Sequence, residues 1–170
     1  MSAGPPAGSG LTSVVALSLW LGAALLVVAV VAPAAFAVLP TRTLAGALVG
    51  RVLPVLFWSG AAVGLLVVVL GRAQEGGARL LAGVALSLAC LAAQLAIAPR
   101  IGRLRAAVAV PIDRLAPDDA RRIAFGRLHA ASVAMLGIAA LAGSAALLFT
   151  VRALVSSDAR AGLPNSPQSP

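Results

Sequence analysis

The chain has 170 residues, of which 61% are hydrophobic and only 11% are charged, whereas a soluble domain carries about a quarter charged residues. This balance excludes an ordinary soluble domain and indicates a membrane protein with one domain. The net charge of +8 does not indicate a nucleic-acid-binding protein, because the arginines lie in short segments between apolar runs. We expect the lipid bilayer, with anionic head groups beside these loops, as the partner, and no nucleic acid.

Residues 1–10 form a Pro-, Gly- and Ser-rich tail that we expect to be disordered. The uncharged run that follows predicts a first membrane helix over about residues 11–39, since about 20 apolar residues cross a bilayer. Pro33 is expected to kink the end of this helix. Ala35-Phe36-Ala37 imitates a signal-peptidase site, but the run lacks a basic start and is too long, so we expect a retained helix.

Residues 42–51 are expected to form a connection, and residues 51–71 the second membrane helix. Pro54 lies in the first turn of such a helix, where proline is tolerated; a helix that begins earlier would be kinked there. Gly60 and Gly64 are four residues apart, which lets two helix backbones approach closely. Packing within the bundle is one explanation, and a homodimer formed through this face is the alternative.

A polar turn at residues 72–79 leads into the third membrane helix, residues 79–99. Residues 100–127 are the one substantial loop and carry seven arginines. Within it, Ala116-Pro117-Asp118-Asp119 predicts a helix start, so we expect the loop to be partly helical and to continue into the fourth membrane helix, residues 128–151. Residues 153–170 form a second tail that we expect to be disordered.

Four spans with short connections predict an all-α integral membrane four-helix antiparallel bundle within residues 11–152. The side with the long loop holds nine arginines, and the side with both tails holds four. The positive-inside rule places the long loop in the cytoplasm and both termini outside. Because all basic residues are arginine and Ala, Gly, Val and Leu abound, we expect a multi-pass protein of the bacterial cytoplasmic (inner) membrane.

Antiparallel spans bring the ends of the first and third helices and the starts of the second and fourth to one face. In the fourth helix, alternating steps of three and four residues define an inward seam that is polar at this face and small and apolar further in: Arg122, Phe125, His129, Ser132, Leu136, Ala139, Gly143 and Ala146. We therefore expect a polar vestibule here, with the candidate residues His129, Ser132, Gln94, Arg122, Phe125 and Arg100. The residues expected to shape the helices around it are Pro33, Phe36, Pro54 and Pro99.

His129 is the only histidine, and ionisable groups within a membrane usually face the bundle interior or a cavity. The structural alternative is that His129 caps helix packing through a hydrogen bond to Gln94 or to a backbone carbonyl. We expect no catalytic residues, because the sequence contains no nucleophile–base–orienter set and no phosphate loop. One His, one Cys and two Met do not make a spaced metal-ligand set.

Four short motifs together resemble the transmembrane-protein-205-like family of small four-helix membrane proteins, whose biochemistry is largely unknown. The motifs are Ala32-Pro33-x-x-Phe36-x-x-Leu39, Ala45-Gly46, Pro99-Arg100-Ile101 and Phe125-x-x-Leu128-His129-x-x-Ser132. The resemblance covers roughly residues 11–151. The family pattern often has asparagines near the third-span proline and after the serine, where this chain has Gln94 and Leu136.

We expect a non-enzymatic scaffold, accessory or small transporter-like protein with a cytoplasm-facing polar vestibule. The alternative is a haem- or quinone-linked membrane redox protein that uses His129. The family is similar in outline to copper-resistance-protein-D-like proteins and to membrane-bound haem-containing protoporphyrinogen oxidases. One histidine per chain could supply only one axial ligand to haem.

Overall fold

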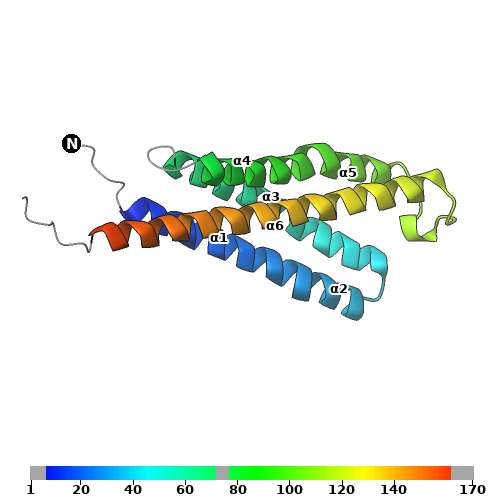
Figure 1. The fold of residues 1–170 in the computed structure, drawn as a ribbon. Helices are drawn as coiled ribbons and strands as arrows, with labels where there is room; N and C mark the ends of the chain where they lie inside the picture. The colour runs from blue at the N-terminus through cyan, green and yellow to red at the C-terminus, as the bar shows by residue number, and fades with distance from the viewer. Residues whose placement is uncertain (1–6, 72–76, 162–170) are drawn as a thin grey trace, which may run out of the picture.

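The protein, described by a computed structural model over residues 7–71 and 77–161, is built from helices (Figure 1). The α-helices are α1 (Ala7–Leu26), α2 (Ala32–Val38), α3 (Arg42–Gly71), α4 (Gly77–Leu91), α5 (Ala98–Ala106) and α6 (Ala120–Ala161). Two π-helical segments, η1 (Val27–Val31) and η2 (Ala92–Ile97), join α1 to α2 and α4 to α5. A short 3-10 turn, η3 (Ile112–Arg114), precedes α6.

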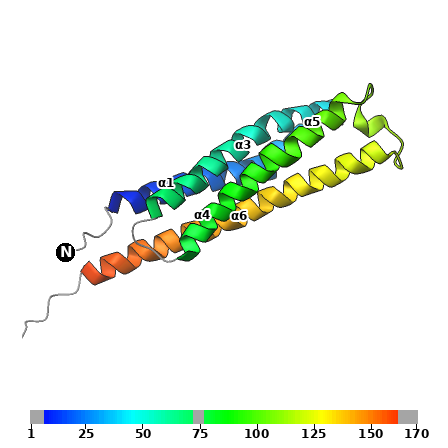
Figure 2. The ribbon, with the colours of Figure 1, turned by 90° about the horizontal axis from the view of Figure 1, so that it is seen from above.

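These elements form a four-helix bundle in which every neighbour is antiparallel (Figures 1 and 2). α1 packs against α3 and α6, and α4 packs against the same two helices, so α1 and α4 lie on one diagonal. Four runs are long and apolar enough to cross a membrane: Gly8–Val38, Arg42–Gly71, Gly77–Ala106 and Ala120–Ser157. The predicted all-α four-helix bundle is confirmed, and the chain is a multi-pass membrane protein.

Close helix approach holds the core together. The buried Trp20 donates its indole N–H to the carbonyl of Leu56 at 2.9 Å, which joins α1 to α3. A Cβ placed on Gly60 would lie 2.6 Å from Cys90 Sγ, and one on Gly64 would lie 2.6 Å from the carbonyl oxygen of Gly83. Both glycines are buried between helices of the same chain, so this face is not free for a second copy.

Two prolines account for the two π-helical segments. Proline has no N–H, and its ring clashes with the carbonyl four residues earlier. Those carbonyls belong to Ala29 in η1, before Pro33, and to Leu95 in η2, before Pro99. A wider π turn accommodates each missing hydrogen bond. The irregularity expected at Pro33 thus takes the form of a π-helical segment, and Pro99 on the diagonally opposite helix follows a second one.

The helices extend beyond the predicted boundaries at both termini and between the first two spans. Residues 7–10 and 153–161, expected in the disordered tails, are helical, while residues 1–6 and 162–170 lie outside the described part. Residues 42–51 are the first turns of α3 and not a connection, because Thr41 caps the helix: its Oγ1 accepts a hydrogen bond from the N–H of Leu44 at 3.2 Å. Pro54 consequently lies inside α3.

The long loop is also more helical at its start, since α5 continues to Ala106. α6 begins at Ala120 and not near Pro117. The reason is that Asp119 caps it, with Oδ1 accepting from the N–H of Arg121 at 2.8 Å. Pro117 lies in the preceding turn, which the N–H of Asp119 closes on the carbonyl of Ala116 at 3.0 Å.

Candidate functional site

The bundle opens into a cavity of about 950 Å³ at one end. This end, which we call the arginine-rich end, holds the turn between α2 and α3 and the connection of residues 107–119 between α5 and α6. The α2–α3 hairpin diverges there from α5 and α6 (Figure 1). Most of the lining is apolar or small; its polar members are Arg42, Thr43, Gln94, Arg105, Asp113, Arg122, His129 and Ser132.

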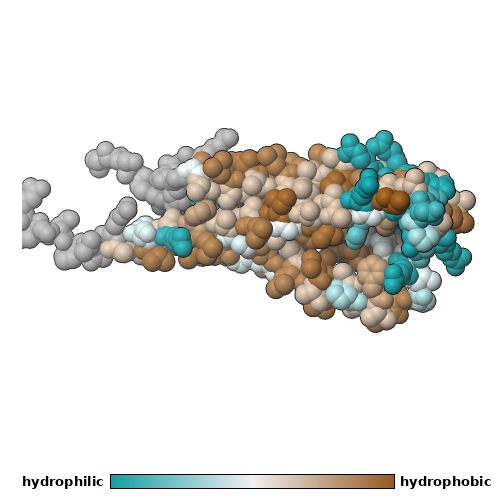
Figure 3. Space-filling model, turned by 45° about the vertical axis from the view of Figure 1, so that its right-hand side comes forward, coloured by the Kyte–Doolittle hydropathy of each residue, from teal (hydrophilic) through white to brown (hydrophobic). Residues whose placement is uncertain are grey.

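The surface changes character at the same end. Figure 3 shows hydrophilic residues gathered there, whereas the body of the bundle presents mainly hydrophobic surface. Exposed apolar side chains such as Leu19, Leu65 and Leu141 cover this body. Such a surface suits contact with lipid chains, so the cavity lies where the apolar belt meets the polar end.

The structure brings five of the six vestibule candidates together on the cavity wall. They are His129, Ser132, Gln94, Arg122 and Phe125, and the helix-shaping residues Phe36 and Pro54 line it as well. Arg100 does not line the cavity: it is exposed and donates to the carbonyl of Ala96 in the preceding turn at 2.7 Å. Pro33 and Pro99 are also outside the lining and act on the helix path instead.

Three side chains form a stack along the cavity wall. The guanidinium carbon of Arg105 lies 5.3 Å from the centroid of the Phe125 ring, within the range of a cation–π contact. The Phe125 and His129 rings are nearly parallel, at 8°, with centroids 6.3 Å apart, which is an offset stack. His129 is exposed, lines the cavity and makes no hydrogen bond within the described part of the chain, so the bond to Gln94 or to a carbonyl that the structural alternative includes is not formed there.

Arg105 is a site residue that the sequence analysis missed. Its guanidinium lies against α3, where a Cβ on Gly46 would be 3.6 Å from Nη2 and one on Gly50 would be 3.5 Å from Nη1. The signal was present in the spacing, because Gln94, Ala98 and Arg105 follow the steps of one helix face. It was hidden because the third membrane helix was expected to end at Pro99.

Two hydrogen bonds fasten the rim of the cavity. Thr43 Oγ1 donates to Asp113 Oδ1 at 3.2 Å, which joins α3 to η3. Arg122 Nη1 donates to the carbonyl of Leu115 at 2.7 Å, which joins α6 to the connection before it. The rim thus carries the side chains of Arg42, Arg105 and Arg122 against the carboxylate of Asp113, an excess of positive charge.

Gln94 lies deeper in the cavity, in η2. Its Oε1 is buried and has no hydrogen-bond partner among the described residues. A buried acceptor without a hydrogen bond costs about 1–3 kcal/mol of stability. Packing alone therefore does not account for a glutamine at position 94.

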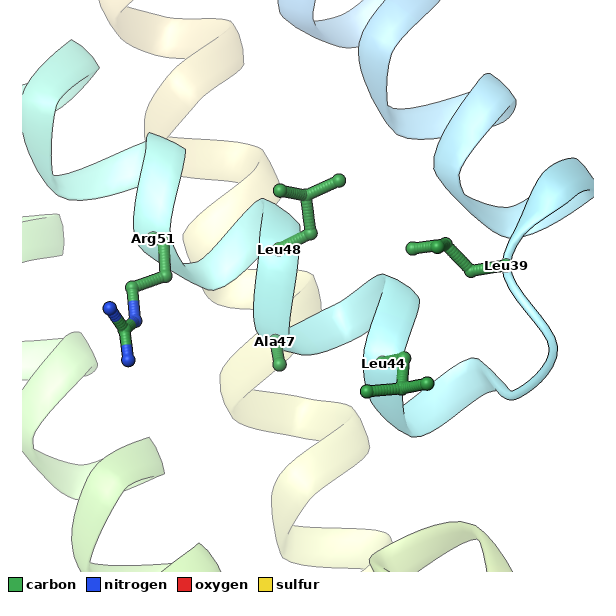
Figure 4. Close-up of a pocket in the computed structure, with 5 residues that line it drawn as sticks. All are labelled: Leu39, Leu44, Ala47, Leu48 and Arg51. Carbon is green, nitrogen blue, oxygen red and sulfur yellow. The ribbon is translucent and has the colours of Figure 1, made fainter.

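A second, smaller recess lies beside the α2–α3 turn, with a volume of about 350 Å³. In Figure 4, the leucine side chains of its lining gather beside the turn, while Arg51 extends away from them. The lining is Leu39, Leu44, Ala47, Leu48 and Arg51. Four of these five side chains are apolar, and the arginine can extend its charged end away from them toward water. Such a surface suits contact with lipid chains.

A buried polar contact fastens the opposite end of the bundle. Arg79, which the sequence placed in a polar turn, is only 5% exposed, and its Nη2 donates to Ser13 Oγ at 3.1 Å. This bond joins α4 to α1 across the diagonal. Within the described residues, no group of three or more His, Cys, Asp or Glu side chains is placed to hold a metal ion.

Comparison with known proteins finds a matching family over more than half of the chain. The family is described as a domain of unknown function (DUF4149), and its model matches residues 15–109. No curated protein and no solved structure matches this chain. The matched segment includes the cavity residues Gln94 and Arg105 and ends before α6, which supplies Phe125 and His129.

Proposed function

We propose that this chain, which belongs to the DUF4149 family, is a non-enzymatic membrane protein that binds a small amphipathic molecule in the cavity at its arginine-rich end. The observation that carries this proposal is the cavity itself. Its volume of about 950 Å³ and its apolar walls with a few convergent polar groups are typical of small-molecule sites between the helices of a bundle. A small transporter or an accessory protein would use such a site.

The side chains on the wall suit holding a molecule. Arg42, Arg105 and Arg122 supply positive charge, and Gln94 and Ser132 can donate and accept hydrogen bonds. A haem- or quinone-linked redox protein is the alternative. In that case the exposed ring of His129 would provide a single ligand or hydrogen bond to the cofactor.

The orientation and the finer family assignment are part of the same proposal. With nine arginines on the side of the long loop, the positive-inside rule favours a cavity that opens to the cytoplasm of a bacterial inner membrane. We also propose that the family is the transmembrane-protein-205-like one. All four motifs that carry this resemblance contribute residues to the cavity wall, which supports one shared site: Phe36, Gly46, Ile101, Phe125, His129 and Ser132.

The test is to fill the cavity and to ask whether a bound molecule is lost. Ser132→Trp places a large ring in the cavity, and Val133→Trp, on the neighbouring exposed residue, is the matched control. Gently solubilised proteins are compared by native mass spectrometry and absorbance. We expect a small co-purifying molecule in the wild type and in Val133→Trp and its loss in Ser132→Trp.

The other outcomes count against the proposal. The same amount of co-purifying molecule in both tryptophan variants would contradict a binding cavity. So would the absence of a bound molecule from all of the proteins. A Soret band or a quinone that disappears in Ser132→Trp would favour the redox alternative.

A further inference from the structure

Arg105 is held in place by packing alone. Its guanidinium lies between the Phe125 ring, with the carbon 5.3 Å from the ring centroid, and the glycine surface of Gly46 and Gly50. The stack of Phe125 on His129 supports this arrangement from the other side. A guanidinium fixed in this way loses little freedom when it binds a ligand, which favours affinity.

The N–H donors of Arg105 have no partner in the part of the chain that the structure describes. Within the described residues it makes no hydrogen bond and no ion pair, although it lines the cavity and is exposed. Two of its neighbours at the rim are engaged, since Arg122 donates to the carbonyl of Leu115 and Asp113 accepts from Thr43; Arg42 is a further cation at the rim. The planar fork of N–H groups on Arg105 matches the geometry of a carboxylate or phosphate group.

The arginines and the aspartate of the cavity lie at its rim, while the deeper wall is apolar except for the uncharged side chains of Gln94 and Ser132. Between Gly46 at the rim and Phe57, α3 rises by about 16 Å, at about 1.5 Å per residue. The cavity wall over this depth includes the apolar side chains of Leu53 and Phe57 and, from the facing helix, Ala98. A ligand that fits both regions carries its charge at the rim and its apolar part toward the centre of the bundle.

We infer that the cavity takes a single-chain amphiphile with one oxyanion head group, a long-chain carboxylate or phosphate monoester, and that Arg105 binds this head group. This inference rests on the proposed function and specifies its ligand class. The apolar chain lies along Leu53 and Phe57, and the head group meets the guanidinium of Arg105 beside Phe125. Phe125 and the two glycines act as positioning residues for Arg105.

The test measures binding to the purified full-length protein of four probes: a fluorescent long-chain carboxylate, a phosphate monoester of similar chain length, the corresponding long-chain alcohol, and inorganic phosphate. We expect the two long-chain anions to bind at least tenfold more tightly than the alcohol and than inorganic phosphate. Charge-assisted hydrogen bonds from one guanidinium account for a difference of about this size.

Variants then assign the head-group site. Arg105→Gln is expected to weaken binding of the long-chain anions about tenfold or more and to leave the alcohol unchanged. Arg103→Gln, on the same helix but outside the cavity lining, is the matched control and is expected to bind as the wild type does. Gly50→Leu keeps the charge but displaces the guanidinium, and it is expected to weaken anion binding as well.

The outcomes separate this inference from the proposed function. If the alcohol binds as well as the anions, or if Arg105→Gln and Arg103→Gln have equal affinities, the head-group assignment is wrong while a binding cavity still stands. If inorganic phosphate binds as tightly as the long-chain anions, the apolar chain is not recognised and the ligand class is wrong. If none of the probes binds while Ser132→Trp still removes a co-purifying molecule, the ligand is of another class.

Discussion

At the residue scale, one short motif has two different uses in this chain. Gly60 and Gly64 are buried and bring helix backbones together, with Gly64 against the backbone of Gly83. Gly46 and Gly50 have the same spacing, yet the space they leave is next to the guanidinium of Arg105. The spacing of two glycines predicts a groove on a helix, and the neighbouring element decides what lies in it.

Gly60→Ala tests the first use. The added Cβ would lie 2.6 Å from Cys90 Sγ and 2.7 Å from the Trp20 ring, so we expect a loss of about 1–3 kcal/mol in the free energy of unfolding. Detergent-induced unfolding followed by tryptophan fluorescence measures this loss. Gly137→Ala is the control, since a Cβ there has no neighbouring atom within 4 Å and is expected to be neutral or slightly stabilising. Equal stability of the two variants would show that the helices around Gly60 are not packed as described.

At the scale of elements, prolines and caps determine where helices bend and begin. Pro33 and Pro99 each follow a π-helical segment, so the two spans continue past their prolines. Thr41 and Asp119 cap α3 and α6, which places both helix starts at the arginine-rich end. The walls of the cavity follow from these four positions, because they determine where α2, α3, α5 and α6 run.

The cap of α6 gives a prediction about pH. The side-chain hydrogen bond from Arg121 lowers the pKa of Asp119 from 3.8 to about 2. A carboxyl whose pKa is lower in the folded state stabilises that state fully above its unfolded value and loses the effect as pH falls through the folded value. We therefore expect the first turn of α6 to be protected down to about pH 4 and to fray as pH approaches 2.

Hydrogen exchange of the amides at the start of α6 measures this effect. Asp119→Ala is expected to speed their exchange several-fold at neutral pH and to remove the change between pH 4 and 2. Asp118→Ala, at the exposed neighbouring position, is expected to exchange as the wild type does. A pH profile that is the same with and without the Asp119 carboxyl would contradict the cap.

At the scale of the whole molecule, the bundle is closed at one end and open at the other. Arg79 and Ser13 join the diagonal helices α4 and α1 at the closed end. At the arginine-rich end the α2–α3 hairpin diverges from α5 and α6 (Figure 1), and the hydrogen bond of Thr43 to Asp113 joins α3 to the connection before α6. The polar cavity therefore lies at one end of the described bundle.

Labelling with a membrane-impermeant maleimide tests which side this is. In a Cys90→Ala background, Ala107→Cys reports on the connection between α5 and α6, and Ser166→Cys reports on the C-terminal tail. From the count of nine arginines against four, we expect Ser166→Cys to react in intact cells and Ala107→Cys to react only after lysis. The reverse pattern would place the cavity on the outer side of the membrane.

The sequence predicted the number of spans and the inward face of the fourth helix. A bilayer fixes the length of an apolar span, so four uncharged runs were sufficient for the fold class. The seam on α6 followed from helical period alone, and its members Leu136, Ala139, Gly143 and Ala146 are buried. The start of the second span was predicted less well, since it was placed at Arg51 where the cap at Thr41 decides it, whereas the helix start predicted near Pro117 lies close to the cap at Asp119.

Only the tertiary structure decided which polar residues meet. Arg100 and Arg105 are both on α5, and the spacing that groups Arg105 with Gln94 and Ala98 does not tell what that helix face contacts. The π turn before Pro99 sets the rotation of α5, and it turns Arg105 toward Phe125 and leaves Arg100 on its own helix. The period of a single helix can be read from its sequence. The rotation of one helix against another depends on contacts between residues far apart in the chain, and those contacts form the cavity.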